Sequence, residues 1–566
     1  MKTPIFDAIV IGSGIAGGWA AKELTERGLR TLLIERGSEI SHPRDYKSDF
    51  AAPWELQNRG LVPEALAQRD YPVQSKCYAF NEQSRDRFVN DREHPYEQVA
   101  PFDWIRGYQT GGRSMMWGRQ CYRWSELDFT ANYEDGHGTD WPIRYQDLAP
   151  WYDHVEAFAG ISGNRDGLAQ IPDGNFQPPM AMNCVEKAVK ARIEKAFPDR
   201  RLIIGRAAHL TAPEKIHTDL GRGKCMNRNM CEQARGCSFG AYFSTPAATL
   251  PAARRTGRLE MVHDMVVREI IFDRERGRAS GVRAVERDTL RPREFQAHLI
   301  FLCAGTLPST QIMLNSVSEA FPNGIGNGSG VLGRYLMDHH MRVSAAGIYP
   351  GFEDHYYSGR RPNGIYIPRF RNLGHKRENY LRGFAYQGGG GRAGWRRGAS
   401  EAGFGVDFKR RLRMPGPWYF YLSGFGEMLP RRENRVWLDP EKRDRWGMPL
   451  LHVEARWSEN EYRMREDMLA SAVEMLEAAG LKNINSSNEE HAPGLTIHEA
   501  GTARMGRDPK TSVLNAYNQC HQVPNLFVTD GASLASSPCQ NPSLTLMALT
   551  ARAVAFAVKK FRQGKV

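Results

Sequence analysis

The 566-residue sequence contains no apolar run of 18 residues or more, which excludes a membrane-spanning helix. It has only nine cysteines, too few for a disulfide scaffold in a chain of this length. The first predicted strand begins directly after Met1–Pro4, which leaves no room for a signal peptide. We therefore expect a cytoplasmic protein, or a periplasmic one if a partner subunit carries the export signal.

The sequence also lacks a concentrated block of charge, although its formal net charge is +12. Its basic residues are spread along the chain in short clusters such as 409–413, and no nucleic-acid recognition motif accompanies them. A solvated basic face is the main interpretation, and docking of an acidic electron-transfer partner is the alternative. A hydrophobic content of 41% indicates a globular protein, and the length indicates two domains or one with an elaborate second lobe.

The N-terminal stretch has the pattern of a dinucleotide-binding βαβ unit. An apolar run at 6–11 leads into three glycines at the spacing GxGxxG and then into a helical pattern. Gly12 allows a tight turn, Gly14 lets the backbone approach a pyrophosphate, and Gly17 lets the helix pack against the strand. The helix N-terminus attracts phosphates through its free N–H groups and its dipole.

A second apolar run at 31–34 closes on Glu35 and Arg36. The acidic residue lies about twenty positions after the glycines, where a dinucleotide-binding unit places the side chain that accepts hydrogen bonds from the ribose hydroxyls. This pattern does not distinguish FAD from NAD.

A second glycine turn follows at 107–118, with large apolar residues beside its glycines. With this turn the chain resembles the glucose–methanol–choline (GMC) family of FAD-dependent oxidoreductases, in which a Gly-Gly-x-Ser turn like 111–114 lies against the flavin. The segment 140–152 is also similar to the family. Some sugar-oxidising relatives bind the flavin covalently through a histidine in a Ser-Thr-His-Trp stretch, and Met116 stands at that position here. The resemblance therefore implies FAD that is bound non-covalently.

The same resemblance suggests further cofactor contacts. In the family, a valine matching Val267 contacts the adenine through its backbone, a strand ending like Ala304-Gly305 holds the dinucleotide, and an aspartate matching Asp530 neighbours the ribityl and pyrophosphate groups. The expected cofactor-binding residues are Gly12, Gly14, Gly17, Glu35, Arg36, Gly111, Gly112, Ser114, Met116, Trp117, Gly118, Val267, Ala304, Gly305, Asp530, Gly531, Asn541, Pro542 and Thr545.

The strongest catalytic pattern lies near the C-terminus. In GMC enzymes a histidine in a His-x-x-Gly-Thr context and a His or Asn some forty residues later face the flavin N5 edge, and His498 and Asn541 match those positions. A neutral imidazole is well suited to remove a hydroxyl proton near neutral pH. His498 is thus the predicted base, and Asn541 would orient the same hydroxyl.

Two other clusters contain potential metal ligands. Cys225, Cys231 and Cys237 could bind an iron–sulfur cluster or zinc, and a three-iron cluster occurs in some sugar dehydrogenases of the family. Their spacing is wider than in those cases, so free loop thiols are an equal alternative. Asp338-His339-His340 could suggest a metal site, but no third or fourth ligand recurs at useful spacing. The family has a similar Asp-His at this point, so the resemblance favours a structural role.

The predicted fold is α/β, or α+β overall, with a GMC-type Rossmann-like FAD-binding domain and a substrate domain built on an antiparallel sheet. Residues 1–335 form the first domain, with an irregular excursion at 38–100 and the cysteine-containing segment at 220–240. Residues 336–490 form the substrate domain, and 491–566 return to the first. The four glycines at 388–391 predict a mobile loop or lid.

The resemblance is greatest to the bacterial sugar dehydrogenase branch, which includes glucoside 3-dehydrogenases and the catalytic subunits of gluconate 2-dehydrogenases. It implies oxidation of a secondary ring hydroxyl of a sugar or glycoside to the ketone. Hydride would pass to flavin N5, and electrons would pass to a cytochrome or another carrier. Alternatives are an oxidase that makes hydrogen peroxide, the catalytic subunit of a gluconate or glucose dehydrogenase complex, and an electron-transfer subunit that needs a small partner.

Overall fold

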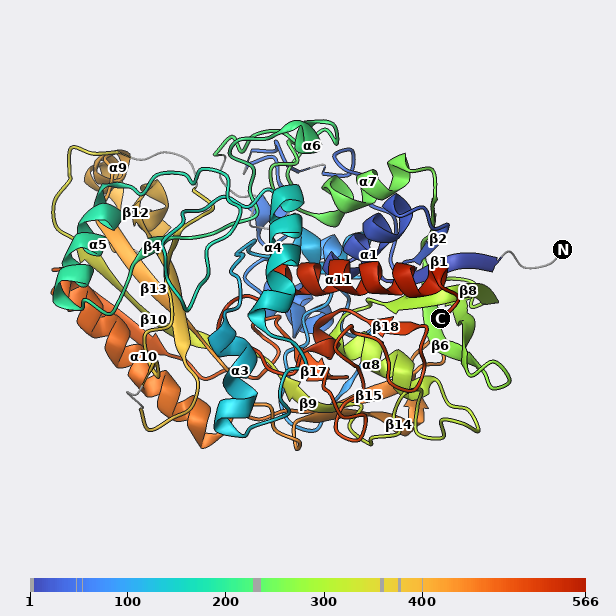
Figure 1. Ribbon diagram of the computed structural model, residues 1–566. Coiled ribbons are helices and arrows are strands. Elements are labelled where there is room, and N and C mark those ends of the chain that lie inside the picture. The colour runs from blue at the N-terminus through green and yellow to red at the C-terminus, as the bar shows by residue number, and fades with distance from the viewer. Residues whose placement is uncertain are drawn as a thin grey trace.

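The computed structural model describes residues 5–46, 48–52, 54–227, 236–356, 361–374, 378–399 and 401–566. Within them the chain forms two lobes, each built on its own sheet (Figure 1). None of the helices in these residues is long and apolar enough to cross a bilayer.

The first sheet contains the predicted dinucleotide-binding strands. Its order is β5-β2-β1-β8-β7-β6, with β18 also paired to β8. β1, β2, β5, β8 and β18 are parallel, whereas β6 and β7 are antiparallel additions. The strands are β1 Ile5–Ile11, β2 Thr31–Ile34, β5 Leu259–Val262, β6 Met265–Asp273, β7 Arg278–Glu286, β8 Pro292–Leu302 and β18 Leu526–Val528.

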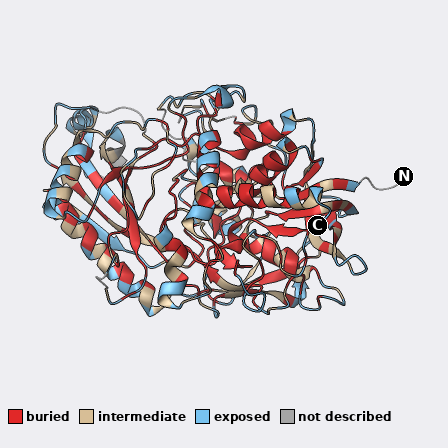
Figure 2. Ribbon diagram, in the orientation of Figure 1, coloured by how far each residue is buried: buried red, intermediate tan, exposed pale blue. Residues whose placement is uncertain are grey.

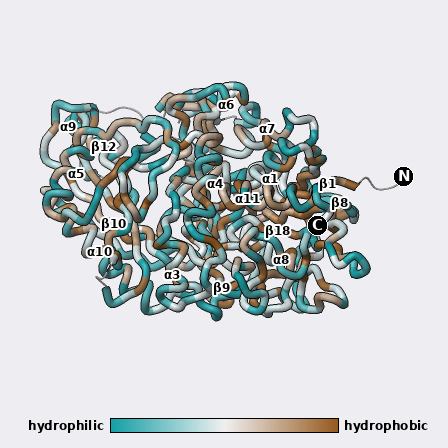
Figure 3. The backbone as a smooth tube through the Cα atoms, viewed as in Figure 1, coloured by the Kyte–Doolittle hydropathy of each residue, from teal (hydrophilic) through white to brown (hydrophobic). Residues whose placement is uncertain are grey.

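Helices α1 (Ile15–Glu26) and α11 (Ser543–Arg562) lie side by side over this sheet (Figure 1). Both are largely buried, and red predominates on them in Figure 2. The start of β1 is correspondingly brown in the hydropathy view of Figure 3. The remaining helices of this lobe are α2 Glu64–Asp70, α3 Glu126–Asp135, α4 Tyr145–Ala159, α6 Lys215–Thr218, α7 Thr249–Arg255 and α8 Thr306–Asn315.

The second sheet is antiparallel, as predicted, in the order β16-β10-β13-β12-β11-β4. Helices α5 and α10 pack their apolar faces on it and expose their outer faces, visible at the left of Figure 2. A capping box in which Ser458 N donates to Glu461 Oε2 at 2.6 Å begins α10. The bounds are β4 Ile203–Ile204, β10 His340–Tyr349, β11 Ile365–Ile367, β12 Phe384–Arg392, β13 Trp418–Gly426, β16 Lys482–Asn488, α5 Cys184–Ala196, α9 Gly405–Arg413 and α10 Glu459–Ala478.

Three features differ from the sequence-based expectation. The glycines 388–391 lie inside β12 and not in a loop, because each pairs with a residue of β13 and a Cβ on Gly388 would lie 2.2 Å from Tyr421 O. Helix α5 and strand β4, expected in the first domain, pack with the second sheet. Residues 435–438, which fall within the range predicted for the substrate domain, belong to a third sheet.

This third sheet has the order β17-β9-β14-β15-β3 and lies below the first lobe in Figure 1. Its strands are β3 Glu97–Gln98, β9 Arg334–Met337, β14 Arg435–Arg443, β15 Pro449–Glu454 and β17 Ala500–Thr502. Two of the chain's crossings between the lobes pass through it, since β9 leads into β10 and β17 follows directly after the segment with His498. It therefore fixes the position of that segment.

Candidate functional site

A cavity of about 1280 Å³ extends from the glycine turn after β1 to the strands β12 and β13 of the second sheet. Typical small-molecule sites measure roughly 300–1,000 Å³. This cavity therefore has room for a large cofactor and a substrate together. Its walls come from both lobes.

The first glycine turn leaves an open, positively polarised surface at one end of the cavity. Gly12 has φ +92°, and Gly14 precedes α1 with no side chain capping the helix. A Cβ on Gly14 would meet no atom within 4 Å, so it would project into the cavity. A Cβ on Gly17 would lie 1.8 Å from Gly12 O, which explains the close helix–strand packing. The exposed amides fit a pyrophosphate.

Glu35 and Ser13 connect this turn to the second one. Glu35 lines the cavity and accepts hydrogen bonds from Ser13 N and Gly37 N, both at 2.9 Å. Burial raises the pKa of Glu35. Ser13 Oγ in turn accepts from Gly111 N at 2.8 Å. Sequence reasoning did not identify Ser13, although it lies between the first two glycines of the motif.

The second turn faces the same cavity with Gly112, Ser114, Met116, Trp117 and Gly118. Gly111 has φ +89° and is not part of the lining, since a Cβ there would lie 2.7 Å from the Pro246 ring. The thioether of Met116 offers no nitrogen for a covalent bond to a cofactor. Non-covalent attachment, which was predicted from this residue, stays a prediction.

Most of the other predicted cofactor residues line the cavity, and Thr545 does not. Thr545 lies outside the cavity lining, and its Oγ1 is 2.7 Å from Tyr152 OH. Asp530 accepts a hydrogen bond from Gly305 N at 2.9 Å, and burial raises its pKa. Those that line the cavity are Gly12, Gly14, Glu35, Arg36, Val267, Ala304, Gly305, Asp530, Gly531, Asn541 and Pro542.

The two predicted catalytic side chains meet in the cavity wall. Asn541 Nδ2 lies 3.4 Å from His498 Nε2, although 43 residues separate them in sequence. Gln387 of β12 donates from Nε2 to Asn541 Oδ1 at 2.8 Å. Because Oδ1 is occupied, the amide directs its N–H group toward the imidazole. Sequence reasoning missed Gln387, whose position beside the glycines of β12 was interpreted as a loop.

The backbone that holds His498 is fixed by a buried aspartate. Asp338 accepts hydrogen bonds from Gly494 N at 2.7 Å and His498 N at 3.1 Å. Burial, together with the nearby Glu499 carboxylate, raises the pKa of Asp338 to about 7. Ile497 has φ +67°, a strained conformation for a β-branched residue. Such strain is typical of functional sites that the surrounding structure holds in place.

His498 remains neutral in this environment. Burial lowers its pKa well below the ordinary value, and His339 and the Arg113 guanidinium lower it further. Arg113 donates to Glu499 Oε2 at 2.6 Å and so is itself paired. A neutral imidazole at neutral pH is the form that accepts a proton.

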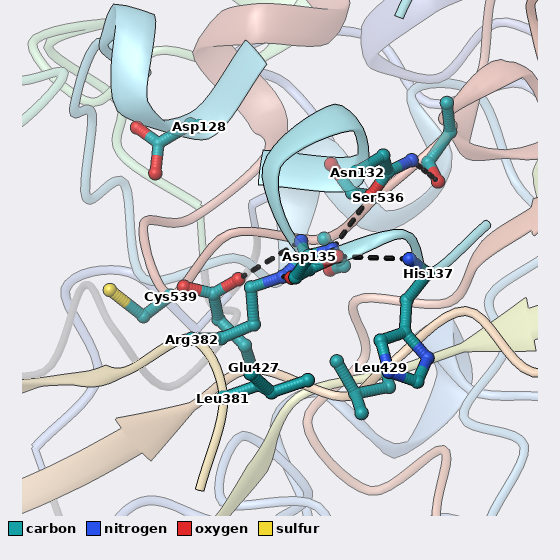
Figure 4. Close-up of polar contacts among 12 residues, drawn as sticks. Asp128, Asn132, Asp135, His137, Leu381, Arg382, Glu427, Leu429, Ser536 and Cys539 are labelled. Atoms are coloured by element: carbon teal, nitrogen blue, oxygen red, sulfur yellow. Dashed lines mark hydrogen bonds and ion pairs between the residues drawn. The ribbon is translucent and has the colours of Figure 1, made fainter. Parts of the chain in front are cut away.

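The loop 535–541, which carries Asn541, is anchored mainly to helix α3 and its surroundings. Asn132 donates to Ala535 O at 2.9 Å, Trp141 Nε1 donates to Ser536 Oγ at 2.7 Å, and Gln540 Nε2 donates to Asp128 Oδ2 at 3.1 Å. Figure 4 shows Arg382 between Glu427 and the Asn132–Asp135 end of α3. This buried polar network connects the loop to both lobes.

The predicted metal ligands are only partly described. Cys225 and Cys237 are half-buried, and Cys231 lies outside the described residues. Within the part of the chain that the structure describes, no group of three His, Cys, Asp or Glu side chains is placed to bind a metal ion. The iron–sulfur cluster stays a prediction.

Comparison with known proteins places this geometry in context. Family models described as GMC oxidoreductase match residues 6–341 and 430–550. The chain is 26% identical to 2-methyl-1,2-propanediol dehydrogenase of Mycolicibacterium austroafricanum, over 98% of this chain and 95% of that protein. It is also 26% identical to the fructose dehydrogenase large subunit of Gluconobacter japonicus, over 99% of this chain and 98% of that protein. A solved structure of an Aspergillus oryzae formate oxidase, determined to follow the effect of a mutation on FAD modification, has a TM-score of 0.61 at 13% identity and full coverage of both chains.

Proposed function

Because the chain belongs to the GMC oxidoreductase family, we propose that it uses FAD to oxidise a secondary ring hydroxyl of a sugar or glycoside to the ketone. The observation that carries the proposal is the pair His498 and Asn541 in the wall of a cavity that also contains both glycine turns. FAD, when bound, supplies the hydride acceptor. The chain supplies the base, the orientation of the hydroxyl and a cavity with walls from both lobes.

The residues present fit this cofactor. The α1 N-terminus with Gly14 would hold the pyrophosphate, Glu35 the ribose, and the β6 backbone at Val267 the adenine. The turn around Gly112 would hold the flavin ring. Open space beside Gly14 and the uncapped helix end support this assignment.

The opposite end of the cavity has the chemistry of a carbohydrate site. Its lining combines the amide of Gln387 and the paired charges of Glu186 and Arg361 with the half-exposed rings of Tyr419 and Tyr421. Sugars present hydroxyl groups at their edges and C–H groups on their faces, so polar and aromatic walls complement them. This composition favours a sugar over a purely apolar alcohol.

At neutral pH, neutral His498 removes the hydroxyl proton through Nε2, and the Asn541 amide donates to the same oxygen. General-base catalysis contributes roughly 10²–10⁴-fold to a rate. We expect His498→Gln to retain FAD and to lose turnover by about that factor. Near-normal turnover in this variant would remove His498 from the mechanism.

The test is anaerobic reduction of the purified holoenzyme. The sugar probes are methyl β-D-glucopyranoside and fructose, and acyclic gluconate tests the alternative of a gluconate dehydrogenase. The non-sugar alcohol is 2-methyl-1,2-propanediol, and His498→Gln is the matched control protein. Bleaching of the flavin absorbance by a sugar probe but not by the diol supports the proposal. Bleaching by the diol alone contradicts the substrate class.

The final electron acceptor is tested in the same preparation. We propose a carrier protein such as a cytochrome, together with a small partner subunit. Slow reoxidation of the reduced flavin in air supports a carrier, whereas rapid reoxidation with hydrogen peroxide formation favours the oxidase alternative. About three irons per chain with acid-labile sulfide would support a three-thiolate cluster at Cys225, Cys231 and Cys237. Protein without iron would contradict it.

A further inference from the structure

His498 has a second partner, on the side of the ring away from Asn541. Its Nδ1 lies 2.9 Å from Nδ1 of His339, and the two rings meet edge to face with centroids 4.8 Å apart. A contact of this length between two ring nitrogens requires one to donate a proton and the other to accept it. Two arrangements are therefore conceivable, and they differ in whether Nε2 of His498 carries a proton.

The surroundings of His339 favour one arrangement. His339 is fully buried, and its Nε2 lies 3.0 Å from Ser537 Oγ. Burial lowers the pKa of His339 to about 4, so the ring is neutral and carries a single proton. Backbone hydrogen bonds with Pro538 and Ser537 oppose this lowering, which means that these groups accept a proton from the ring. A single proton placed on Nε2, toward that loop, leaves Nδ1 as an acceptor. His498 must then donate from its Nδ1.

The contacts on the Asn541 side of His498 favour the same arrangement. Gln387 donates to Asn541 Oδ1, so the Asn541 amide presents its N–H group toward His498 Nε2. An N–H group facing Nε2 requires a lone pair there. Both neighbours of His498 thus agree that its proton is on Nδ1 and that Nε2 is bare.

We propose that His339 is a positioning residue, which holds His498 in the tautomer whose bare Nε2 faces the substrate hydroxyl. The inference rests on the proposed function, because it assumes that His498 acts as the base. It assigns to His339 a role in catalysis that the sequence pattern Asp338-His339-His340 did not indicate. Which ring nitrogen carries the proton is commonly set by the hydrogen bond of the other nitrogen.

A spectroscopic experiment tests the tautomer without any substrate. Two-bond ¹H–¹⁵N correlation spectra of histidine-labelled holoenzyme distinguish a ring protonated at Nδ1 from one protonated at Nε2. The His498 signals are assigned by their loss in His498→Gln. We expect protonation at Nδ1 in the wild-type protein and a shift toward Nε2 in His339→Leu. Protonation of His498 at Nε2 in the wild type would overturn the proposal, whatever the substrate is.

Three substitutions of His339 separate positioning from a purely structural role. Asparagine places an oxygen near the site of Nδ1, glutamine places its polar group near Nε2, and leucine offers neither. We expect His339→Asn to keep flavin reduction by methyl β-D-glucopyranoside within a few-fold of wild type. We expect His339→Gln and His339→Leu to lose about 100-fold in kcat with little change in KM.

Two outcomes of the kinetic series would contradict the proposal. One is a wild-type rate in His339→Leu. The other is an equal loss in all three variants, since a packing defect would not depend on the acceptor. If no probe reduces the wild-type flavin, the proposed function fails, and the tautomer spectra still decide the role of His339.

Discussion

A carboxylate at position 541 is expected to move the pH dependence of the reaction. Asn541→Asp keeps the shape of the side chain but places a negative charge near His498 Nε2, which lies 3.4 Å from the present amide nitrogen. With an effective dielectric constant of about 20, charges about 3.5 to 5.5 Å apart attract by about 3 to 5 kcal/mol, or about two to four pKa units. The pKa of His498, now well below its ordinary value, should rise by that amount.

Because the base form of His498 exists only above its pKa, the acid limb of the kcat/KM profile should move to higher pH by two to four units. Asn541→Ala is the matched control, since it also loses the amide donor but adds no charge. The assay is the rate of anaerobic flavin reduction from pH 4 to pH 9. An acid limb at the same pH in both variants would refute the electrostatic reasoning.

Three further outcomes follow from the described contacts. Arg382→Met removes a buried guanidinium that pairs with Asp135. We expect the free energy of unfolding in urea to fall by about 3–5 kcal/mol, and a loss below about 1 kcal/mol would contradict this. The lowered pKa of His339, about 4 against 6.5 when unfolded, stabilises the fold above pH 6.5, and this contribution is lost as the pH falls. At pH 4 the loss amounts to about 3 kcal/mol, so His339→Asn should show a smaller difference in unfolding free energy between pH 7 and pH 4. Gly14→Ala places a methyl group in the open cavity. The fraction of protein with bound flavin, measured by absorbance, should therefore fall while the circular dichroism spectrum stays unchanged. Full flavin content would contradict the predicted pyrophosphate site.

The glycine turns could be predicted from sequence because their cause is local. Gly12 and Gly17 are required by contacts between neighbouring elements, and the spacing of the motif records those contacts directly. The glycines of β12 were misinterpreted for the opposite reason. Their pairing partner is β13, which follows only after an intervening helix, and the close approach of its backbone leaves no local signal.

The same distinction applies to the site. His498 and Asn541 were predicted because the family pattern marks them. The distance of 3.4 Å between Asn541 Nδ2 and His498 Nε2 comes only from the structure. His339 and Gln387 come from two further segments, and sequence alone gives no indication that they join the same chain of hydrogen bonds. The interpretation of Asp338 as structural was closer, since it holds the backbone of His498.

The return of the chain to its first sheet has a consequence for biosynthesis. Strand β18 pairs with β8, and helix α11 packs beside α1, so the hydrophobic core around the first glycine turn includes the last part of the chain. Domains usually fold in order as the ribosome releases them. Here the N-terminal lobe must wait in an incomplete state until α11 emerges, with its apolar surface exposed in the meantime. Acquisition of the cofactor is then a late event, and deletions that remove α11 should leave a chain that depends on chaperones.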